Sequence, residues 1–375
     1  MNFPPHPHAS AAKIDWYSFL ARPRLPSPNV ESLEQLRDTS ILVTGAGGSI
    51  GSALSLQLTQ LHPKHLVLLD ASEQSLHRLQ SQLAETALST QPSLALASIN
   101  DRSHLDEIFE IHRPQLVFHA AAYKHVPLLE EHPLEAISNN AIGTGTLIEC
   151  AKKSGTVRIV LLSTDKAVEP INILGATKRI AELATLAAGG VVLRLGNVLG
   201  TEGSVSETFL RQISAGDPIT ITASDAERYF LTCEEAVDLL LASAIAAPPA
   251  CLLVPNLDRQ HSIASLADFL ARTCSSEKPS PVTFTGLRPG DKAREALWSS
   301  DEQPFRINEH GYSEIRQHIR DYSLLRHDLN QLEDAVRERD LASALELVLR
   351  LVPSYQPGST VTALASHSPS GAAQR

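Results

Sequence analysis

The sequence lacks the features that mark several classes of protein. Its 375 residues include only four cysteines and no C-x-x-C pair, so neither a zinc site nor a redox dithiol is expected. A reduced, cytoplasmic setting fits this cysteine usage. The longest apolar stretch is broken by Pro248 and Pro249 before it reaches 18 residues, so no membrane span is expected. The first residues show no basic-then-apolar pattern, so no secretory signal is expected.

Positive charge and several catalytic motifs are also missing. The chain has 32 basic and 42 acidic residues, a net charge of −10, which argues against nucleic acid as the main partner. No P-loop motif occurs, so a kinase reading has no support. No H-E-x-x-H motif occurs either. His119 and His125 have no metal-ligand spacing, so we expect packed or hydrogen-bonded histidines and no metal.

The length and composition divide the chain into zones. Its size suits one large α/β domain, or a large domain with a smaller one. Residues 1–38 are rich in proline and histidine and form an arm that packs on the body, packs on a partner or stays partly disordered. We expect a core domain over 39–194 and a smaller portion, interleaved with core elements, over 195–352. Residues 353–375, rich in Ser, Pro, Gly and Ala, are expected to be a disordered tail.

Strands and helices are expected to alternate through the core. Helices should begin at Ser49 and after a capping Ser72, whose helix buries Leu76, Leu79, Leu83 and Ala87. Further helices are expected over 104–112 and 133–153. The predicted strands are Ser40–Thr44, His65–Asp70, Leu94–Ile99, Leu116–Phe118 and Arg158–Ser163. This alternation predicts an α/β fold with a doubly wound parallel (Rossmann) sheet, whose ligands bind at the carboxyl ends of the strands.

The first predicted strand ends in a glycine-rich turn. Gly45 allows a tight turn, Gly48 lets the backbone approach a pyrophosphate, and Gly51 lets the next helix pack on the sheet. Ser49 and Ile50 open that helix, whose N-terminus offers N–H donors to phosphate. Asp70 follows at the end of the second strand, where a carboxylate binds an adenosine ribose. It would repel a 2′-phosphate, so the sequence favours NAD, with NADP still possible.

Several further motifs follow the glycine-rich turn in a fixed order. Together they resemble the CapD-like polysaccharide biosynthesis proteins, a branch of the extended short-chain dehydrogenase/reductases that includes UDP-N-acetylglucosamine 4,6-dehydratases. The resemblance covers about residues 39–300, with a weaker echo to about 355. The motifs are His119–Pro127, Asn139–Thr144, Ser163–Val168, Gly175–Lys178, Arg194–Gly200, Arg228–Phe230 and Gly286–Lys292.

The resemblance implies catalytic roles for residues after the strand that ends at Ser163. Thr164, Asp165 and Lys166 would face the ligand crevice, with Asp165 as the acid for a departing hydroxyl and Lys166 as the base at the sugar C5. Lys178 would bind the nicotinamide ribose. The superfamily places a tyrosine at the position of Leu174, and leucine moves no proton. The base that takes the C4 hydroxyl proton is therefore unassigned, and the candidates are Lys166 and a water held by Thr164.

Other site positions follow from the same resemblance. Ala120, Ala121 and Ala122 would allow backbone contact with the cofactor, and Lys124 would face cofactor or sugar. Asp101 or Asn100 would contact adenine, because Ser98 stands where an acid is usual. Asn140 would order the fold near the site. The residues expected to hold a UDP-sugar are Asn197, Arg228 and Arg288, since arginine suits a diphosphate.

These expectations combine into one function with two alternatives. The sequence predicts NAD-dependent 4,6-dehydration of a UDP-N-acetylhexosamine, UDP-GlcNAc first, for surface polysaccharide or glycoconjugate synthesis. A UDP-sugar 4-epimerase is the alternative enzyme, although it has no leaving hydroxyl to need Asp165 and Lys166. A non-catalytic NAD-binding scaffold is the third reading, motivated by Leu174. The resemblance also implies a homo-oligomer.

Overall fold

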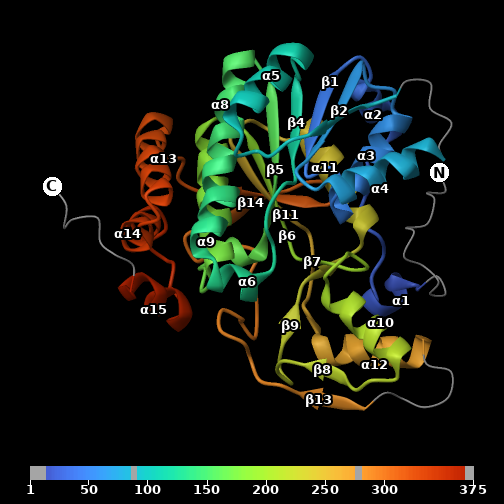
Figure 1. Cartoon of the computed structure of the whole chain (residues 1–375). Coiled ribbons are helices and arrows are strands. Elements are labelled where there is room, and N and C mark those ends of the chain that lie inside the picture. The colour runs from blue at the N-terminus through green and yellow to red at the C-terminus, as the bar shows by residue number, and fades with distance from the viewer. Residues whose placement is uncertain (1–13, 86–90, 275–280, 368–375) are drawn as a thin grey trace.

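A computed structural model describes residues 14–85, 91–274 and 281–367, and its centre is a nine-stranded sheet (Figure 1). The strand order is β14-β15-β11-β6-β5-β4-β1-β2-β3. The seven strands from β3 to β11 run parallel, and β15 pairs antiparallel with both β11 and the edge strand β14. The strands are β1 (Ser40–Thr44), β2 (His65–Asp70), β3 (Ser93–Leu96), β4 (Leu116–His119), β5 (Arg158–Thr164), β6 (Val191–Leu195), β11 (Cys251–Pro255), β14 (Gln303–Ile307) and β15 (Tyr312–Arg316).

The order β3-β2-β1-β4-β5-β6 confirms the doubly wound Rossmann architecture. The chain leaves β1 toward β2 on one side and returns through β4 on the other. The crevice where ligands bind in such sheets therefore lies beyond the carboxyl ends of β1 and β4. Both strands are fully buried, as parallel strands covered on two faces must be.

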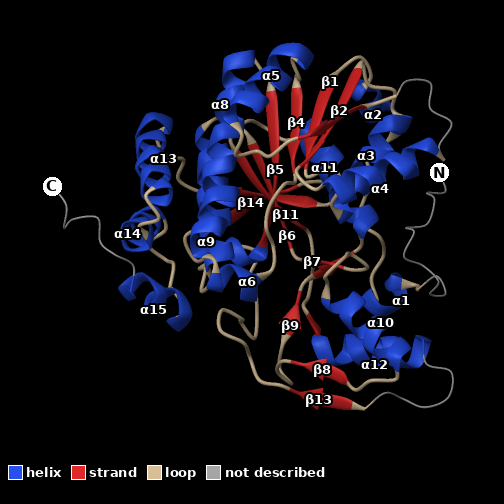
Figure 2. Ribbon diagram, in the orientation of Figure 1, coloured by secondary structure: helices blue, strands red, loops and turns tan. Residues whose placement is uncertain are grey.

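Helices cover both faces of the sheet (Figure 2). Leu54 and Leu58 of α3 pack with α11 on one face, and Ile108 of α5 and Ile148 of α8 belong to the cluster on the other. The helices of the two layers and their neighbours are α3 (Ser49–Gln60), α4 (Glu73–Ala84), α5 (Arg102–His112), α6 (Val126–Glu131), α7 (Pro133–Ala136), α8 (Gly143–Ser154), α9 (Ile173–Ala187) and α11 (Cys233–Ala246). Ser72 caps α4 and Leu76, Leu79 and Leu83 are buried as expected, whereas Ala87 lies outside the described residues.

Two core elements differ from the sequence expectation. The strand expected over 94–99 is Ser93–Leu96, because the chain turns at Ser98 toward α5. The helix expected over 133–153 is interrupted by a π-helical segment, Ile137–Ile142, between α7 and α8. A π-helical turn inserts an extra residue and often lies at a functional site. Here it contains Asn140, whose contacts are described below.

The smaller portion lies beyond the carboxyl ends of the strands (Figure 1). Its own core gathers Phe209, Ile219, Phe230 and Leu266. Three two-stranded pairs, β7 with β10, β8 with β13 and β9 with β12, support it. These elements are β7 (Asn197–Val198), β8 (Ile219–Ile221), β9 (Glu227–Arg228), β10 (Phe230–Leu231), β12 (His261–Ser262), β13 (Val282–Phe284), α10 (Val205–Ala215) and α12 (Ile263–Cys274).

The described part of the N-terminal arm packs on the body, which settles the alternatives left open for it from residue 14 onward. Phe19 stacks edge-on against Phe230, with 5.8 Å between ring centroids. Arg22 donates to both oxygens of Glu235 at 2.6 and 2.9 Å, an ion pair almost free of solvent. The arm contains α1 (Trp16–Leu20), α2 (Val30–Leu33) and the 3₁₀ turn Glu34–Leu36. It therefore ties the smaller portion to α11 of the core.

The expectation of a disordered tail over 353–375 is wrong for residues 353–367. This segment forms a turn and α15, and it buries Tyr355 and Val361, two apolar side chains that a count of Ser, Pro, Gly and Ala overlooks. Of the C-terminal helices, α13 and α14 pack against α9, and α15 contacts α6 (Figure 1). They are α13 (Tyr322–Arg337), α14 (Leu341–Leu351) and α15 (Ser359–His367). Within the described ranges, no helix has the length and apolarity to cross a membrane.

Candidate functional site

The glycine-rich turn between β1 and α3 is built so that side chains do not fit. Gly45 has a φ of +68°, and a Cβ there would lie 2.6 Å from the amide nitrogen of Ala121. A Cβ on Gly51 would overlap the carbonyl oxygen of Gly45. Gly48 is the N-cap of α3, whose first turn has N–H groups without partners in the helix. The turn thus presents a bare backbone and a positive helix end, which suits a diphosphate.

Asp70 stands beside this turn at the end of β2. Its Oδ2 accepts a hydrogen bond from the Gly47 amide at 2.9 Å, and its Oδ1 accepts one from Ser72 at 2.8 Å. Each carboxylate oxygen still has a free lone pair. The half-buried Asp70 therefore fixes the turn and retains acceptors for the hydroxyls of a ribose. The donors and acceptors at these two strand ends fit an adenine dinucleotide.

Glu202 links two of the predicted binding residues, although no sequence motif singled it out. Its amide donates to Ser49 Oγ at 3.0 Å, and its carbonyl accepts from Lys124 Nζ. Its carboxylate pairs with Arg78 of α4 at 3.2 Å. The turn containing Glu202 thus lies across the start of α3, close to the glycine-rich turn. From the sequence, only the glycine that follows Glu202 and the small residues near it could have suggested a turn here.

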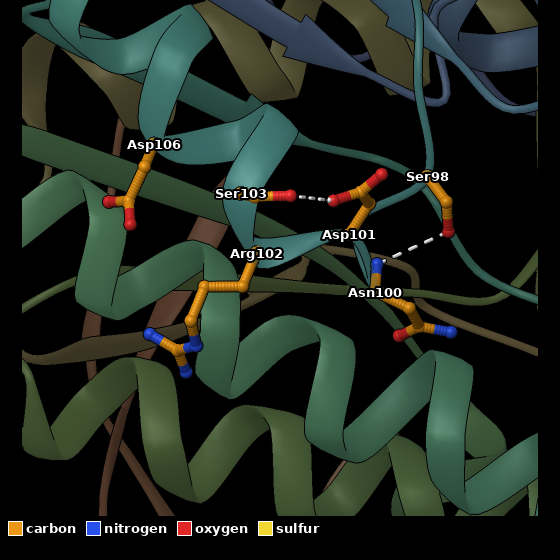
Figure 3. A pocket seen from close by; sticks show the side chains of 6 residues that line it. All are labelled: Ser98, Asn100, Asp101, Arg102, Ser103 and Asp106. Carbon is orange, nitrogen blue, oxygen red and sulfur yellow. Dashed lines mark hydrogen bonds between the residues drawn. The ribbon is translucent and has the colours of Figure 1, made fainter.

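The end of β3 leads into a shallow pocket lined by six residues: Ser98, Asn100, Asp101, Arg102, Ser103 and Asp106 (Figure 3). Asp101 caps α5 and accepts hydrogen bonds from the His104 amide at 3.1 Å and the Ser103 hydroxyl at 2.8 Å. These bonds lower the pKa of Asp101. Figure 3 shows its carboxylate turned toward Ser103, and the pocket places Asp101 and Asn100 together at the strand end where an adenine contact is predicted.

Thr164 is the last residue of β5, and Asp165 and Lys166 begin the 3₁₀ turn that follows, Asp165–Ala167. Asp165 has no solvent exposure. Its Oδ1 accepts from Thr164 Oγ1 at 2.9 Å and from Lys166 Nζ at 3.0 Å. Lys166 also reaches Asn197 Oδ1 at 3.4 Å. The structure therefore gathers four of the predicted site residues around one buried carboxylate.

The buried cluster also contains Glu295, which the sequence analysis missed. Glu295 is 4% exposed, and Lys292 Nζ approaches its Oε2 at 3.6 Å. Burial, and then repulsion from Asp165, raise the pKa of Glu295. Burial opposes the charge of Lys166, but Asp165 and Glu295 outweigh it, so the pKa of Lys166 is raised. The available signal was an acid three residues after the motif that ends at Lys292.

Leu174 and Lys178 lie one turn apart on α9, and both are buried. Lys178 Nζ donates to the carbonyl of Leu162 on β5 at 2.7 Å. Burial lowers the pKa of Lys178 to about 8. The ammonium thus lies at the crevice end of the sheet, where it retains two further N–H donors for a ribose. Leu174 offers only an apolar surface to the site.

Polar side chains behind the crevice hold its walls in place. His119, at the end of β4, hydrogen-bonds Thr44 at 2.7 Å and Thr144 at 2.9 Å, and burial lowers its pKa to about 3. It is a neutral, hydrogen-bonded residue, as predicted. Asn140 accepts from the Tyr123 amide at 2.8 Å and donates to the Tyr123 carbonyl at 3.1 Å. It therefore orders the loop that carries Ala120, Ala121, Ala122 and Lys124.

The two arginines predicted to bind a UDP-sugar have different surroundings. Arg228 donates to the main-chain carbonyls of Glu227, Lys292 and Ala293 at 2.7 to 2.8 Å. Its guanidinium therefore fixes the segment that precedes Glu295. Arg288 is largely exposed and pairs with Asp291 at 2.9 Å. Arg288 is thus free to turn toward a ligand, whereas Arg228 acts first on the protein's own backbone.

Comparison with known proteins places the chain in a family. The family described as "Polysaccharide biosynthesis protein" matches residues 41–316. The probable polysaccharide biosynthesis protein EpsC of Bacillus subtilis is 38% identical over 72% of this chain and 47% of its own length. CapD of Staphylococcus aureus, a capsular polysaccharide biosynthesis protein, is also 38% identical, over 72% and 46%. The chain thus spans about half the length of these two relatives.

Other similar proteins have names that include specific activities. A UDP-glucose 4-epimerase of Rickettsia rickettsii is 30% identical over 71% of this chain and 79% of its own. The structure of Pen from Bacillus thuringiensis is 26% identical with a TM-score of 0.70, over 76% of this chain and 88% of that one. DesIV of Streptomyces venezuelae, a dTDP-glucose 4,6-dehydratase solved with NAD, shares the fold at 18% identity, with a TM-score of 0.59 over 69% and 87%. The chain belongs to the CapD-like polysaccharide biosynthesis family of the extended short-chain dehydrogenase/reductases.

Proposed function

We propose that the protein removes water from a UDP-N-acetylhexosamine, UDP-GlcNAc first, giving a 4-keto-6-deoxy sugar nucleotide for surface polysaccharide or glycoconjugate synthesis. The observation that supports this most is the contact between buried Asp165 and partly exposed Lys166 at the end of β5. A dehydration needs an acid for the C6 hydroxyl and a base for the C5 proton. A carboxylate and an amine 3.0 Å apart, facing the crevice beyond a parallel sheet, supply both groups.

NAD is the cofactor that these residues would hold. The glycine-rich turn and the N-terminus of α3 would bind its diphosphate, Asp70 its adenosine ribose and Lys178 its nicotinamide ribose. Bound there, it would accept a hydride from the sugar C4 and return it at C6. The bare turn gives a direct test of this assignment. A Cβ on Gly51 meets the Gly45 carbonyl, so Gly51→Ala should abolish NAD binding measured by calorimetry, whereas Asn29→Ala in the arm should not.

The protein's own groups would manage the protons. Removal of a hydride from C4 makes the C5 proton acidic, because the neighbouring carbon becomes a carbonyl. Lys166 carries a charge in the free protein, so it must give up a proton before it accepts one from C5. Asp165, beside it, would protonate the C6 hydroxyl as that group leaves as water. Asn197 would hold the Lys166 ammonium in position through their 3.4 Å contact.

The base for the C4 hydroxyl has to come from the same cluster. Leu174 cannot take a proton, and Thr164 directs its hydroxyl hydrogen at Asp165. The lone pairs of Thr164 Oγ1 still face the peptide of Lys166 and the crevice. We infer that Thr164 holds a water over C4, and that this water passes the proton toward Lys166 and Asp165. Thr164→Val should therefore lower kcat while Thr164→Ser largely preserves it.

A UDP-sugar 4-epimerase is the second candidate, favoured by the 30% identity to epimerases such as that of Rickettsia rickettsii. An epimerase returns the hydride to C4 and eliminates nothing. It therefore has no use for an acid at C6. The Asp165–Lys166 pair gives the dehydratase priority, because only the dehydration needs an acid for a departing hydroxyl.

The deciding experiment is incubation of the purified protein with NAD and UDP-GlcNAc, followed by mass spectrometry and proton NMR. A product lighter by one water, with a new C6 methyl signal and no net NADH, supports the dehydratase. An unchanged mass with a C4 epimer supports the epimerase. A bound cofactor with no turnover across several UDP-hexosamines supports the non-catalytic scaffold. Asp165→Asn should abolish the dehydration and leave NAD binding intact.

A further inference from the structure

Glu130, near the end of α6, is a buried acid that the proposed chemistry does not use. It is shielded from solvent, with 2% of the residue exposed. Its Oε1 accepts a hydrogen bond from the Ile173 amide at 2.7 Å. Ile173 is the first residue of α9, the helix that contains Leu174 and Lys178. Glu130 therefore ties α6 to the first turn of that helix.

Two side chains from outside α9 hold its first turn. Asn172 is the N-cap, and its Oδ1 accepts from the Gly175 amide at 2.7 Å. Glu130 accepts from the Ile173 amide, so two of the amides that have no partner within the helix are satisfied. Lys178 lies in the next turn of the same helix. A shift of the first turn would therefore move the amine that is proposed to bind the nicotinamide ribose.

The other oxygen of Glu130 lies against the C-terminal segment. A Cβ on Gly358 would lie 2.8 Å from Oε2 of Glu130, so a side chain does not fit there unless the carboxyl group moves. Within the described part of the chain, Oε2 accepts no hydrogen bond. Two residues before Gly358, the Gln356 amide donates to the Pro170 carbonyl at 2.9 Å. Pro170 lies between the turn Asp165–Ala167 and α9, so the segment contacts this connection as well as the acid that caps the helix.

A third segment, the loop formed by residues 286–292, reaches the same place. Gly290 has a φ of +82°, and a Cβ there would lie 3.0 Å from Cβ of Asn172 and 3.6 Å from Cδ of Glu130. The Gly290 carbonyl accepts a hydrogen bond from Asn172 Nδ2 at 2.8 Å. Glu130 is thus the point where the start of α9, this loop and the C-terminal segment meet.

We propose that Glu130 is a positioning residue that couples the C-terminal segment, residues 355–358, to the first turn of α9 and so holds Lys178 in place for the nicotinamide ribose. The segment lies beyond residue 316, where the match to the family ends. Its contribution to the site is therefore additional to the motifs that the family shares. The effect on turnover rests on the proposed function, whereas the effect on NAD affinity rests only on the proposed cofactor.

The first test is NAD affinity, measured by calorimetry on the full-length protein. Glu130→Leu removes the acceptor of the Ile173 amide, so NAD should bind about 5-fold more weakly or worse. Glu130→Gln keeps a carbonyl oxygen for that amide and should bind NAD within about 2-fold of wild type. Glu131→Leu, the same change at the exposed next residue, is the matched control and should leave the affinity unchanged. Equal affinities in Glu130→Leu and Glu131→Leu, or equal losses in Glu130→Leu and Glu130→Gln, overturn the proposal.

The second test asks whether the C-terminal segment acts through Glu130. Gly358→Ala places a methyl group against Oε2, so it should weaken NAD binding about as much as Glu130→Leu does. In a Glu130→Ala background that space is open, and the same change should have no further effect. Ser359→Ala, at the exposed next residue, is the control. The coupling is overturned if Gly358→Ala has no effect, or if its effect adds to that of Glu130→Ala.

Turnover separates this coupling from the proposed function. Glu130→Leu should lower kcat about 5-fold or more with little change in KM for UDP-GlcNAc, because Lys178 would act on the cofactor and not on the sugar. A higher KM at an unchanged kcat would overturn the proposal. If NAD affinity changes as described but no UDP-sugar is consumed, the positioning role stands and the dehydratase assignment fails. If circular dichroism shows that Glu130→Leu does not fold, the comparison of Gly358→Ala with Ser359→Ala decides.

Discussion

Two buried ion clusters lie almost side by side on β5 and β6, and they are built in opposite ways. In the first, Arg194 uses all five guanidinium N–H groups on Glu182, Glu302 and the Leu297 carbonyl, at 2.7 to 3.2 Å. In the second, Asp165 and Glu295 each keep an oxygen without a hydrogen bond, although Lys292 Nζ lies 3.6 Å from that of Glu295. Ser163 donates to Glu182 in the first cluster, two residues before Asp165 of the second. The satisfied cluster is built as part of the scaffold, whereas the other contains the residues of the proposed chemistry.

The electrostatics of the two clusters agree with this division. Burial opposes ionisation of Glu182, but Arg194 overcomes it and lowers the pKa of that acid to about 2. The same pairing raises the pKa of Arg194 above its already high value. Both charges are therefore fixed across the whole physiological range. In the other cluster burial, and then repulsion from Asp165, raise the pKa of Glu295.

The largest expected effect comes from breaking the satisfied cluster. Arg194→Met leaves Glu182 and Glu302 buried without their main partner, which should cost about 3–5 kcal/mol of unfolding free energy. Urea denaturation followed by circular dichroism measures this loss. Lys152→Met, which removes an amine resting on the Tyr322 ring at the surface, should cost less than about 1 kcal/mol. Equal losses in the two variants would remove the contrast between a scaffold cluster and ordinary surface charge.

Breaking the second cluster should have the opposite result, a large loss of activity with little change in stability. Asp165→Asn keeps the shape of the side chain but removes the proposed acid, so turnover of UDP-GlcNAc should fall at least about 100-fold. The free energy of unfolding should change by less than about 1 kcal/mol, or rise, because a carboxylate oxygen without a partner is replaced. Denaturation and mass-spectrometric rates on the same preparation compare the two quantities. A large loss of stability with retained activity would assign Asp165 to the scaffold.

The buried amine of Lys178 gives a further test, because it should make the free energy of unfolding depend on pH. Burial lowers its pKa from 10.5 to about 8 in the folded protein. Between pH 8 and 10.5 the unfolded chain therefore binds more protons than the folded one, so the unfolding free energy should rise with pH by up to about 3 kcal/mol. Lys178→Met should lack this rise. Denaturation of both proteins at pH 7, 8, 9 and 10 measures how the free energy of unfolding of each depends on pH. If the two dependences were parallel, the amine of Lys178 would be exposed to solvent.

The architecture followed from local patterns in the sequence. Alternating strands and helices, and glycines at 45, 48 and 51, are short-range signals, and they placed the sheet, α3 and Asp70 correctly. Asp165 and Lys166 were predictable because they directly follow a strand. The π-helical break at Ile137–Ile142 was not, because only its packing against α9 reveals it.

The residues that the sequence did not reveal are brought to the site by long-range packing. The segment that contains Glu295 is fixed beside the turn after β5 by contacts of Arg228, Lys292 and Gln260. Glu202 meets Ser49 because the chain folds back across α3. The tail shows the same limit: a composition typical of disorder hid Val361, the buried residue of α15. Local composition cannot report a contact that the whole fold creates.

The smallest effect is expected for Arg288, which lies at the exposed edge of the site and belongs to neither cluster. Arg288 and Asp291 form a 2.9 Å pair with most of the arginine in solvent, and such pairs contribute about 0–1 kcal/mol. Arg288→Ala should therefore leave stability unchanged. If Arg288 turns toward the diphosphate of the sugar nucleotide, the same substitution raises KM for UDP-GlcNAc several-fold at constant kcat, because ground and transition states lose the same contact. Arg294→Ala, an exposed arginine paired with Glu227, is the matched control. A KM that rises equally in both variants would mean that general positive charge, and not Arg288, attracts the substrate.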